Sequence, residues 1–232
     1  YIKNNIKNEL LKKQYVYDND YIKGKYKYTF VCEFPEKYEN NYKIDIVCYK
    51  GDLNVVKFLW GIRDEIPFKY SKYAVINACI IGRLDIIKWF WKKRNKMPFK
   101  YTKHAINLAS SNGHLNIIEW FWKKRNEMPF KYCKFAVNEA SSNGHLIIIK
   151  WFWEKRNEIP FKYDENATTY AGWRGNLNIL EWFWEKRNEI TFMYVYDESG
   201  IASVALWKNY LDILEWLEKE NIYDFQNHKY LI

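Results

Sequence analysis

Residues 102–132 read TKHAINLASSNGHLNIIEWFWKKRNEMPFKY, and close variants of this stretch recur along most of the 232-residue chain. The copies keep a step of 31 residues, which is visible at one glycine in each: Gly51, Gly82, Gly113, Gly144 and Gly175. Prolines and tryptophans keep the same step. A fixed period of this length is typical of a solenoid, in which near-identical units stack in a row. The pattern therefore predicts one elongated repeat array rather than two globular domains.

The first part of the unit predicts a short helix that packs closely against its neighbours. Ala105 and Ala109 lie four residues apart, on one face of such a helix, and alanines recur at these positions in the adjacent units. Small residues at this spacing let two helices approach closely. Gly113 follows where the chain must turn sharply, which suits a residue that can take a positive φ.

The second part, residues 115–127, predicts a helix that is sandwiched between units. Its only polar stripe is narrow and consists of Asn116, Glu119 and Lys123. The apolar face is therefore too wide for a surface helix. We expect two columns of tryptophans to lie in the core; they are Trp89, Trp120, Trp151 and Trp182, and Trp91, Trp122, Trp153 and Trp184.

The period also sets the domain organisation. Residues 35–220 form the predicted array of about six units, of which the end units diverge. Residues 1–34 are a non-repeat segment or a degenerate cap, with a short helix near 5–14 and a strand near 25–31. Residues 221–232 form a C-terminal tail. The predicted fold class is all-α, a solenoid of helix–turn–helix units.

Composition indicates the class of protein and the compartment in which it acts. The net charge is +9, and aromatic residues make up 20% of the chain, which supplies ample apolar area for a packed interior. No apolar run approaches the 18 residues of a membrane-spanning helix, so we expect no membrane insertion. The four cysteines (Cys32, Cys48, Cys79 and Cys133) lack metal-ligand spacing. We expect free thiols in a reducing compartment such as the cytoplasm, and no cofactor or metal.

The repeating unit resembles the ankyrin repeat. In residues 108–115, LASSNGHL, two small residues precede two variable ones and then Gly-His-Leu, as in that family; residues 143–146, NGHL, repeat the match. Residues 117–122, IIEWFW, follow where the family has its aliphatic second helix. The period is 31 rather than the family's usual 33. Because NEMPFKY replaces the hairpin segment, we expect a tight turn rather than projecting β-hairpin fingers. This aromatic, Lys- and Asn-rich composition is similar to repeats of large DNA viruses of amoebae, which would place the protein in the host cytoplasm or the virion.

The resemblance also implies where a partner would bind. The two residues before each repeat glycine, which we call the pre-glycine positions, vary most between units, and in ankyrin proteins they face the concave groove. The candidate partner-binding residues are Tyr49, Lys50, Ile80, Ile81, Ser111, Asn112, Ser142, Asn143, Trp173, Arg174, Trp207 and Lys208. Trp173 and Trp207, each followed by a basic residue, are the strongest candidates because Trp and Arg dominate interface energetics. The structural alternative is that these large residues cover the ends of the array.

Two other features have a structural explanation beside a functional one. His114 and His145 each follow a repeat glycine, and we interpret them as turn-stabilising residues rather than metal ligands. The basic runs at 92–94 and 123–125, KKR in both, could form a phosphate-facing surface. Acidic residues are interleaved with these runs, which favours a solvated face.

These observations lead to one functional prediction and one alternative. The prediction is a non-enzymatic scaffold that binds a partner protein along the concave face, as a host-interaction or particle-associated protein if it is viral. The alternative is a helical array that binds nucleic acid through its basic face. The sequence has no phosphate loop, nucleophile elbow or recurring carboxylate pair, so we do not expect an enzyme.

Overall fold

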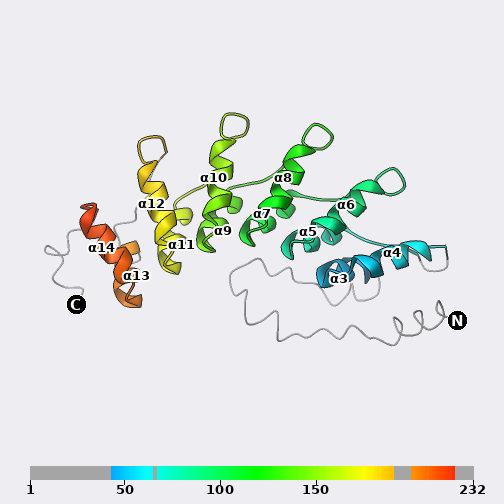
Figure 1. The fold of residues 1–232 in the computed structure, drawn as a ribbon, viewed down its shortest axis with the longest axis horizontal. Helices are drawn as coiled ribbons and strands as arrows, with labels where there is room; N and C mark the ends of the chain where they lie inside the picture. Colours follow the sequence, from blue (N-terminus) through cyan, green and yellow to red (C-terminus); the bar gives the residue numbers. More distant parts are fainter. Residues whose placement is uncertain (1–42, 65–66, 191–199, 223–232) are drawn as a thin grey trace. The chain divides into compact units, whose positions relative to one another are not determined.

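The computed structural model describes residues 43–64, 67–190 and 200–222, and in these residues every regular element is an α-helix (Figure 1). The chain divides into two units, Tyr1–Glu39 and Asn40–Ile232, and all described residues belong to the second. The predictions for residues 1–34, including the helix and the strand, lie outside the described residues. The expectation of an all-helical fold is confirmed for the part that the structure describes.

The described helices form six consecutive pairs. The first helices of the pairs are α3 (Lys43–Lys50), α5 (Lys72–Ile80), α7 (Lys103–Ser111), α9 (Phe135–Ser142), α11 (Asn166–Arg174) and α13 (Ile201–Lys208). The second helices are α4 (Leu53–Gly61), α6 (Leu84–Lys92), α8 (Leu115–Lys123), α10 (Leu146–Glu154), α12 (Leu177–Glu185) and α14 (Leu211–Lys219).

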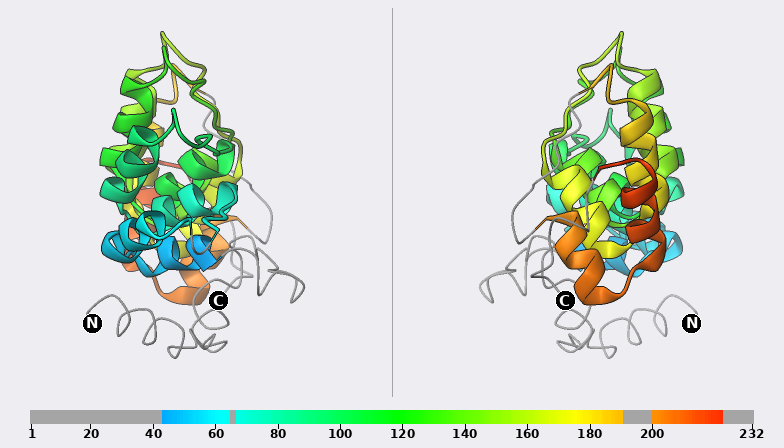
Figure 2. Two further views of the ribbon diagram at one scale, coloured as in Figure 1. Left: turned by 90° about the vertical axis from the view of Figure 1, so that its right-hand side faces the viewer. Right: turned by 90° about the vertical axis from the view of Figure 1, so that its left-hand side faces the viewer.

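The pairs pack against one another in chain order. Each first helix contacts the first helix of the next pair, from α3 against α5 to α11 against α13. The two helices of each pair also contact each other. Figure 1 shows the pairs side by side. Viewed along the row, successive pairs lie behind one another (Figure 2). The sequential packing agrees with a helical repeat.

Alanines make the close contact between first helices possible. Ala105 and Ala109 of α7 are fully buried, and so are their counterparts in the adjacent units: Ala74, Ala78, Ala136, Ala140, Ala167 and Ala171. A larger side chain at these positions would push neighbouring helices apart. The packing role that the sequence predicts for these alanines is confirmed.

The turn between the two helices of a pair is closed in the left-handed conformation. Gly113 has φ of +80°, and its equivalents Gly51, Gly82, Gly144 and Gly175 have φ between +74° and +80°. In the last pair Asn209 takes this place with φ of +56°, which suits the residue that best tolerates this conformation after glycine. The prediction of a positive φ at the repeat glycine is confirmed.

The second helices supply most of the aromatic core. Phe90, Phe121, Phe152 and Phe183 are among the largest fully buried side chains. In the first tryptophan column, Trp120, Trp151 and Trp182 are buried and Trp89 is half-buried; in the second column Trp122 is buried and the others are half-buried. Tryptophans of successive units meet edge to face, for example Trp91 and Trp120 with ring centres 5.8 Å apart. The core prediction therefore holds, with the second column at the edge of the core.

In the described parts of the connections between successive pairs, turns are followed by residues without regular secondary structure, and no hairpin is formed. Turns follow each second helix from α6 to α12, and the structure assigns no strand in the described residues. The tight turn expected in place of hairpin fingers is thus what these segments form. Tyrosine hydroxyls connect the segments, since Tyr101 donates to the Pro129 carbonyl and Tyr132 to the Pro160 carbonyl. None of the described helices is both long enough and apolar enough to cross a membrane.

Candidate interaction surface

The pre-glycine positions lie side by side at the C-terminal ends of the first helices. This placement follows from the packing of the first helices in chain order, with each repeat glycine within two residues of the end of its helix. Two contacts join neighbouring units: Asn143 Nδ2 donates to the Ser111 carbonyl oxygen at 2.8 Å, and Lys208 Nζ donates to that of Trp173 at 2.8 Å. The structure therefore brings these sequence-predicted residues into one row.

In the middle of the row the pre-glycine side chains bond to the array itself. Ser111 is only 4% exposed, and its Oγ accepts a hydrogen bond from Asn143 Nδ2 at 3.1 Å. Asn112 Nδ2 donates to the Leu108 carbonyl oxygen at 2.8 Å. Ser142 is half-buried, and its carbonyl oxygen accepts from Asn176 Nδ2 at 3.0 Å. Ser111 consequently offers almost no surface to a partner, in contrast to the expectation from its position.

At the start of the row the candidate residues are partly covered. Ile80 and Ile81 are half-buried, and the Ile81 side chain lies next to Gly51 of the preceding turn. Tyr49 is half-buried, whereas Lys50 is exposed. This end of the row presents a modest apolar surface with one cation.

At the other end of the row the side chains are large and open to solvent. Trp207 is 81% exposed and Trp173 is 41% exposed. Tyr170 packs on Trp173 with ring centres 6.0 Å apart, and the exposed Arg174 and Lys208 follow the two tryptophans. We call these five residues the Trp173–Trp207 surface. Its Trp, Tyr and Arg side chains belong to the residue types that are enriched at the centre of protein interfaces.

A carboxyl group lies close to this surface. Glu139 of α9 is partly buried, and burial raises its pKa, while the positive charge of Arg174 lowers it by a smaller amount. Arg174 and Glu139 therefore interact across the junction between α9 and α11. The rest of the Trp173–Trp207 surface carries positive charge only.

The basic runs after the second helices are part of the contacts between units. Two cations lie near the ring of Trp91, with the Arg94 guanidinium carbon 4.2 Å and Lys124 Nζ 5.7 Å from its centre. Both cations also pair with Glu127, at 3.2 Å from Arg94 and 2.6 Å from Lys124. We call these four residues a Trp–Arg–Lys–Glu cluster. Cation–π contacts and ion pairs together hold adjacent units in register.

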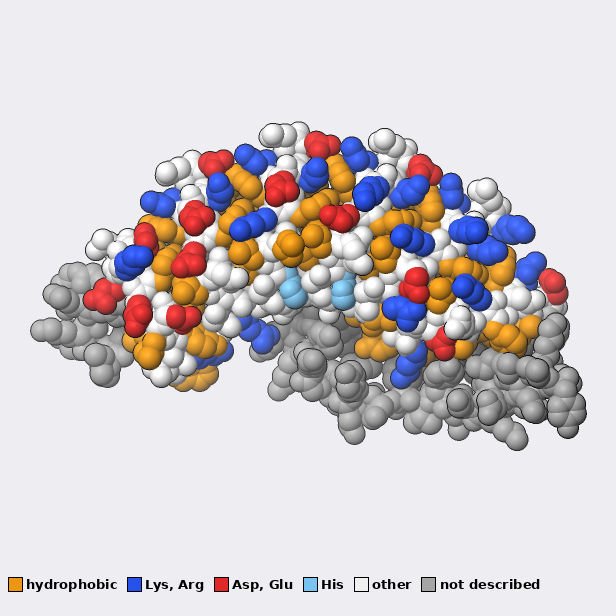
Figure 3. All heavy atoms as spheres, viewed as in Figure 1, with side chains coloured by type: hydrophobic (Ala, Val, Ile, Leu, Met, Phe, Trp, Pro, Cys, Tyr) orange, Lys and Arg blue, Asp and Glu red, His pale blue; other side chains and the backbone are white. Residues whose placement is uncertain are grey.

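The same cluster occurs at the next two junctions. Its members there are Trp122, Arg125, Lys155 and Glu158, and then Trp153, Arg156, Lys186 and Glu189. Acidic and basic side chains are accordingly intermixed on the face shown in Figure 3. The sequence predicted a solvated face and missed the stacking on tryptophan. The three-residue spacing of Trp and Arg was the available signal.

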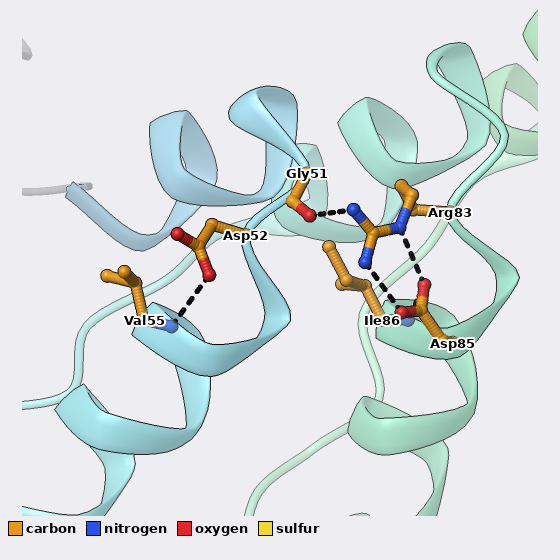
Figure 4. A network of polar contacts seen from close by, with 6 residues as sticks. All are labelled: Gly51, Asp52, Val55, Arg83, Asp85 and Ile86. Atoms are coloured by element: carbon orange, nitrogen blue, oxygen red, sulfur yellow. Dashed lines mark hydrogen bonds and ion pairs between the residues drawn. The ribbon is translucent and has the colours of Figure 1, made fainter.

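The residue after each repeat glycine also connects adjacent units. His114 Nε2 lies 3.0 Å from the Ile80 carbonyl oxygen, and its ring packs against Gly82 of the preceding turn. Asn176 takes this role two units later, and Arg83 takes it one unit earlier by donating to the Gly51 carbonyl oxygen. Figure 4 shows Arg83 bonded to both Gly51 and Asp85. The histidines thus stabilise turns, as expected, but the turn they stabilise is that of the preceding unit.

A buried polar position inside the first helices was missed by sequence reasoning. Asp45 Oδ1 accepts the backbone N–H of Ser71, the N-cap of α5, at 3.0 Å. Asn107 accepts the N–H of Cys133 at 3.2 Å, two units further along. Each bond connects the start of one first helix to the first helix of the preceding unit. Asn107 and Asn138, polar residues 31 positions apart among apolar neighbours, were the available signal.

The three cysteines that the structure describes form no recognisable site. Cys48 and Cys79 are buried free thiols, and Cys133 is a half-buried free thiol whose Sγ accepts from Asn107. Burial raises the pKa of both buried thiols, which keeps them protonated and unreactive. Cys32 lies outside the described residues. Within the described ranges, no three His, Cys, Asp or Glu side chains gather as they would around a metal ion.

No protein-family model matches this sequence, and no curated protein matches it either. Inferences about function therefore rest on the geometry described above.

Proposed function

We propose that this protein is a non-enzymatic scaffold of ankyrin-like repeats that binds a partner protein along its pre-glycine row. The observation that carries the proposal is the exposure of Trp173 and Trp207 at equivalent positions of the contacting helices α11 and α13, at one end of that row. Isolated exposed apolar residues are common, but two neighbouring tryptophans with adjacent cations are typical of interaction sites.

The energetics favour the Trp173–Trp207 surface over the rest of the row. A tryptophan that loses about 150 Å² of apolar surface on binding contributes on the order of 4 kcal/mol before the costs of association. The middle of the row offers small polar groups that already bond to each other, such as Ser111 and Asn143. A partner would therefore gain most of its affinity at α11 and α13.

Two further observations bear on the compartment and the source of the protein. The buried free thiols of Cys48 and Cys79 fit a reducing compartment such as the cytoplasm. The ankyrin-like repeats and the Lys- and Asn-rich composition suggest a protein of a large DNA virus, acting in the host cytoplasm or within the particle.

Nucleic-acid binding is the weaker proposal. The arginines of the basic runs stack on tryptophans and pair with glutamates, as Arg125 does with Trp122 and Glu158. A phosphate would have to displace these glutamates. A titration with DNA and RNA at increasing salt tests this proposal, because binding through phosphates weakens steeply as salt is added.

The test of the scaffold proposal compares partner capture by three forms of the chain after nuclease treatment. The forms are the wild type, Trp173→Ala/Trp207→Ala, and Ile147→Ala as a control. Ile147 is 62% exposed on α10 and lies outside the pre-glycine row. We expect proteins that are captured by the wild type and the control but lost by the double variant. Capture that is equal in all three forms would contradict the proposal, provided that circular dichroism shows equal helix content.

A further inference from the structure

The Trp173–Trp207 surface is positively charged as well as aromatic, and these charges limit which partners can bind to it. Lys208 Nζ lies 5.9 Å from the centre of the Trp207 ring and 5.8 Å from that of Tyr210. Arg174 is exposed directly after Trp173. Any side chain that packs on either tryptophan therefore comes within reach of a cation.

Lys208 keeps donors for a partner. Its ammonium group donates one hydrogen bond, to the Trp173 carbonyl oxygen at 2.8 Å. A lysine ammonium has three donors, so this bond fixes the group beside the tryptophans and leaves further N–H bonds available. The bond also removes much of the conformational freedom that an exposed lysine would lose on pairing with a ligand.

The surrounding charges favour a carboxylate over a cation. Arg174 and Lys208 are positive, and Arg174 interacts with the carboxyl group of Glu139. Burial raises the pKa of Glu139, so it is a weaker counter-charge than an exposed glutamate.

We propose that the Trp173–Trp207 surface recognises an acidic–apolar segment of a protein. In such a segment an aromatic or large aliphatic side chain packs on Trp173 and Trp207, and an Asp or Glu within two residues of it pairs with Lys208 or Arg174. Charge-assisted hydrogen bonds beside an apolar contact are stronger than exposed ion pairs, because the apolar contact excludes water from them. This inference rests on the proposed scaffold function and adds the chemistry of the partner.

The experiment begins with a random twelve-residue peptide library displayed on phage. The full chain is the bait, and peptides that also bind Trp173→Ala/Trp207→Ala are removed. We expect the retained peptides to contain an aromatic or large aliphatic residue within two positions of Asp or Glu. The best peptide is then synthesised with a fluorescent label, together with a form in which its acidic residue is replaced by the corresponding amide.

Anisotropy titrations of both peptides separate the contribution of the charge to the affinity from that of the apolar contact. We expect Arg174→Gln/Lys208→Gln to weaken the acidic peptide about tenfold and to leave the amide peptide unchanged, since one charge-assisted bond supplies roughly this factor. The control is Lys92→Gln/Lys123→Gln, which removes two exposed charges from the second helices. It should change neither affinity by more than a factor of two.

The outcomes distinguish this inference from the function on which it rests. Retained peptides without acidic residues, or acidic peptides whose affinity survives Arg174→Gln/Lys208→Gln, would overturn the acidic–apolar chemistry and leave the scaffold proposal standing. A library that yields no peptide dependent on Trp173 and Trp207 would contradict both.

Discussion

Arg125 and Glu158 are separated by 33 residues, yet Nη2 of the arginine lies 3.4 Å from Oε2 of the glutamate. The same arginine stacks on Trp122, with its guanidinium carbon 4.1 Å from the ring centre. One side chain thus holds an aromatic residue of its own unit and an acid of the next. Repetition of this arrangement along the row explains why arginine follows each cluster tryptophan after three residues.

The first junction of the array lacks the acid, and adding it should increase stability. Arg63 and Lys93 lie over Trp60 at 4.6 and 5.7 Å, but Lys96 stands where Glu127 stands one unit later. Lys96→Glu would therefore complete the cluster. We expect the free energy of unfolding to rise by about 0.5–1 kcal/mol at low salt, measured by urea denaturation.

Salt provides the control for this prediction. The gain from Lys96→Glu should shrink at 1 M NaCl, where charges on the surface are screened over about 3 Å. Lys96→Gln removes the positive charge without adding the acid and should give a smaller gain. A Lys96→Glu variant no more stable than Lys96→Gln would contradict the assigned cluster.

Gly113 is constrained twice, and replacing it should destabilise the array. Its φ is +80°, and a Cβ atom at this position would lie 2.8 Å from Cε1 of His145 in the next unit. We expect Gly113→Ala to lower the free energy of unfolding by about 1–3 kcal/mol, the left-handed conformation alone costing about 1–2 kcal/mol. Thermal and urea denaturation followed by circular dichroism measure this change.

A second glycine gives a matched comparison. Gly61 ends α4 without a positive φ, and a Cβ there would meet nothing within 4 Å. Gly61→Ala should be neutral or stabilising, by up to about 1 kcal/mol. Adding His145→Ala to Gly113→Ala should recover the part of the loss that comes from the contact. Equal losses for Gly61→Ala and Gly113→Ala would show that neither constraint operates.

Local periodicity explains which parts of the fold the sequence predicts. Helix pairs, buried alanines such as Ala109 and the glycine turns follow from residues that are close in the chain, and the structure confirms them. Bonds between units, such as that from Ser71 to Asp45, join residues 26 positions apart. Composition and helical spacing carry no direct information about such pairs. They become predictable only after the relative position of adjacent units is known.

The candidate surface, too, could be predicted from the sequence only in part. Variability between units singled out every pre-glycine position, but exposure at these positions depends on the size of the neighbouring side chains. Ser111 is small and is covered by Asn143, whereas Trp207 is too large to be covered. Sequence variation therefore located the row, and the three-dimensional packing selected its C-terminal end.

His145 should make the array less stable in mild acid. Burial lowers the pKa of His145 from the ordinary value of 6.5, and the nearby His114 lowers it further, while a hydrogen bond to Ser111 opposes them. The folded state thus binds this proton less readily than the unfolded state. The stability that the neutral imidazole confers is present above pH 6.5 and is lost as pH falls through the lowered pKa.

The array itself suggests the variant that tests this effect. Asn176 occupies the position of His145 in the following unit and donates to the carbonyl oxygen of Ser142, the counterpart of Ser111, at 3.0 Å. His145→Asn should therefore keep the contact at pH 7 and make the free energy of unfolding depend less on pH between 7 and 5. Some dependence should remain, because burial also lowers the pKa of His104. An unchanged slope would show that His145 does not contribute.

Asp45 should have the opposite pH dependence. Burial raises the pKa of Asp45 above its ordinary value of 3.8, although hydrogen bonds from Ser71 and the charge of Lys100 lower it in part. The folded state therefore binds this proton more readily than the unfolded state. Its contribution to stability is fully present below pH 3.8 and is lost as pH rises through the raised pKa.

Asp45→Asn should remove the loss of stability at rising pH while keeping the hydrogen bond from the Ser71 N–H. Asn107 and Asn138 fill the same position in later units, and their side-chain oxygens accept the equivalent backbone N–H at 3.2 and 3.3 Å. We expect Asp45→Asn to be at least as stable as the wild type at pH 7, within about 1 kcal/mol. Asp45→Ala should lose about 1–3 kcal/mol, because the Ser71 N–H then lacks its acceptor. Urea denaturation from pH 3.5 to 7 measures both. If Asp45→Asn is as destabilising as Asp45→Ala, the carboxylate itself, rather than an oxygen acceptor, is what the first junction of the array requires.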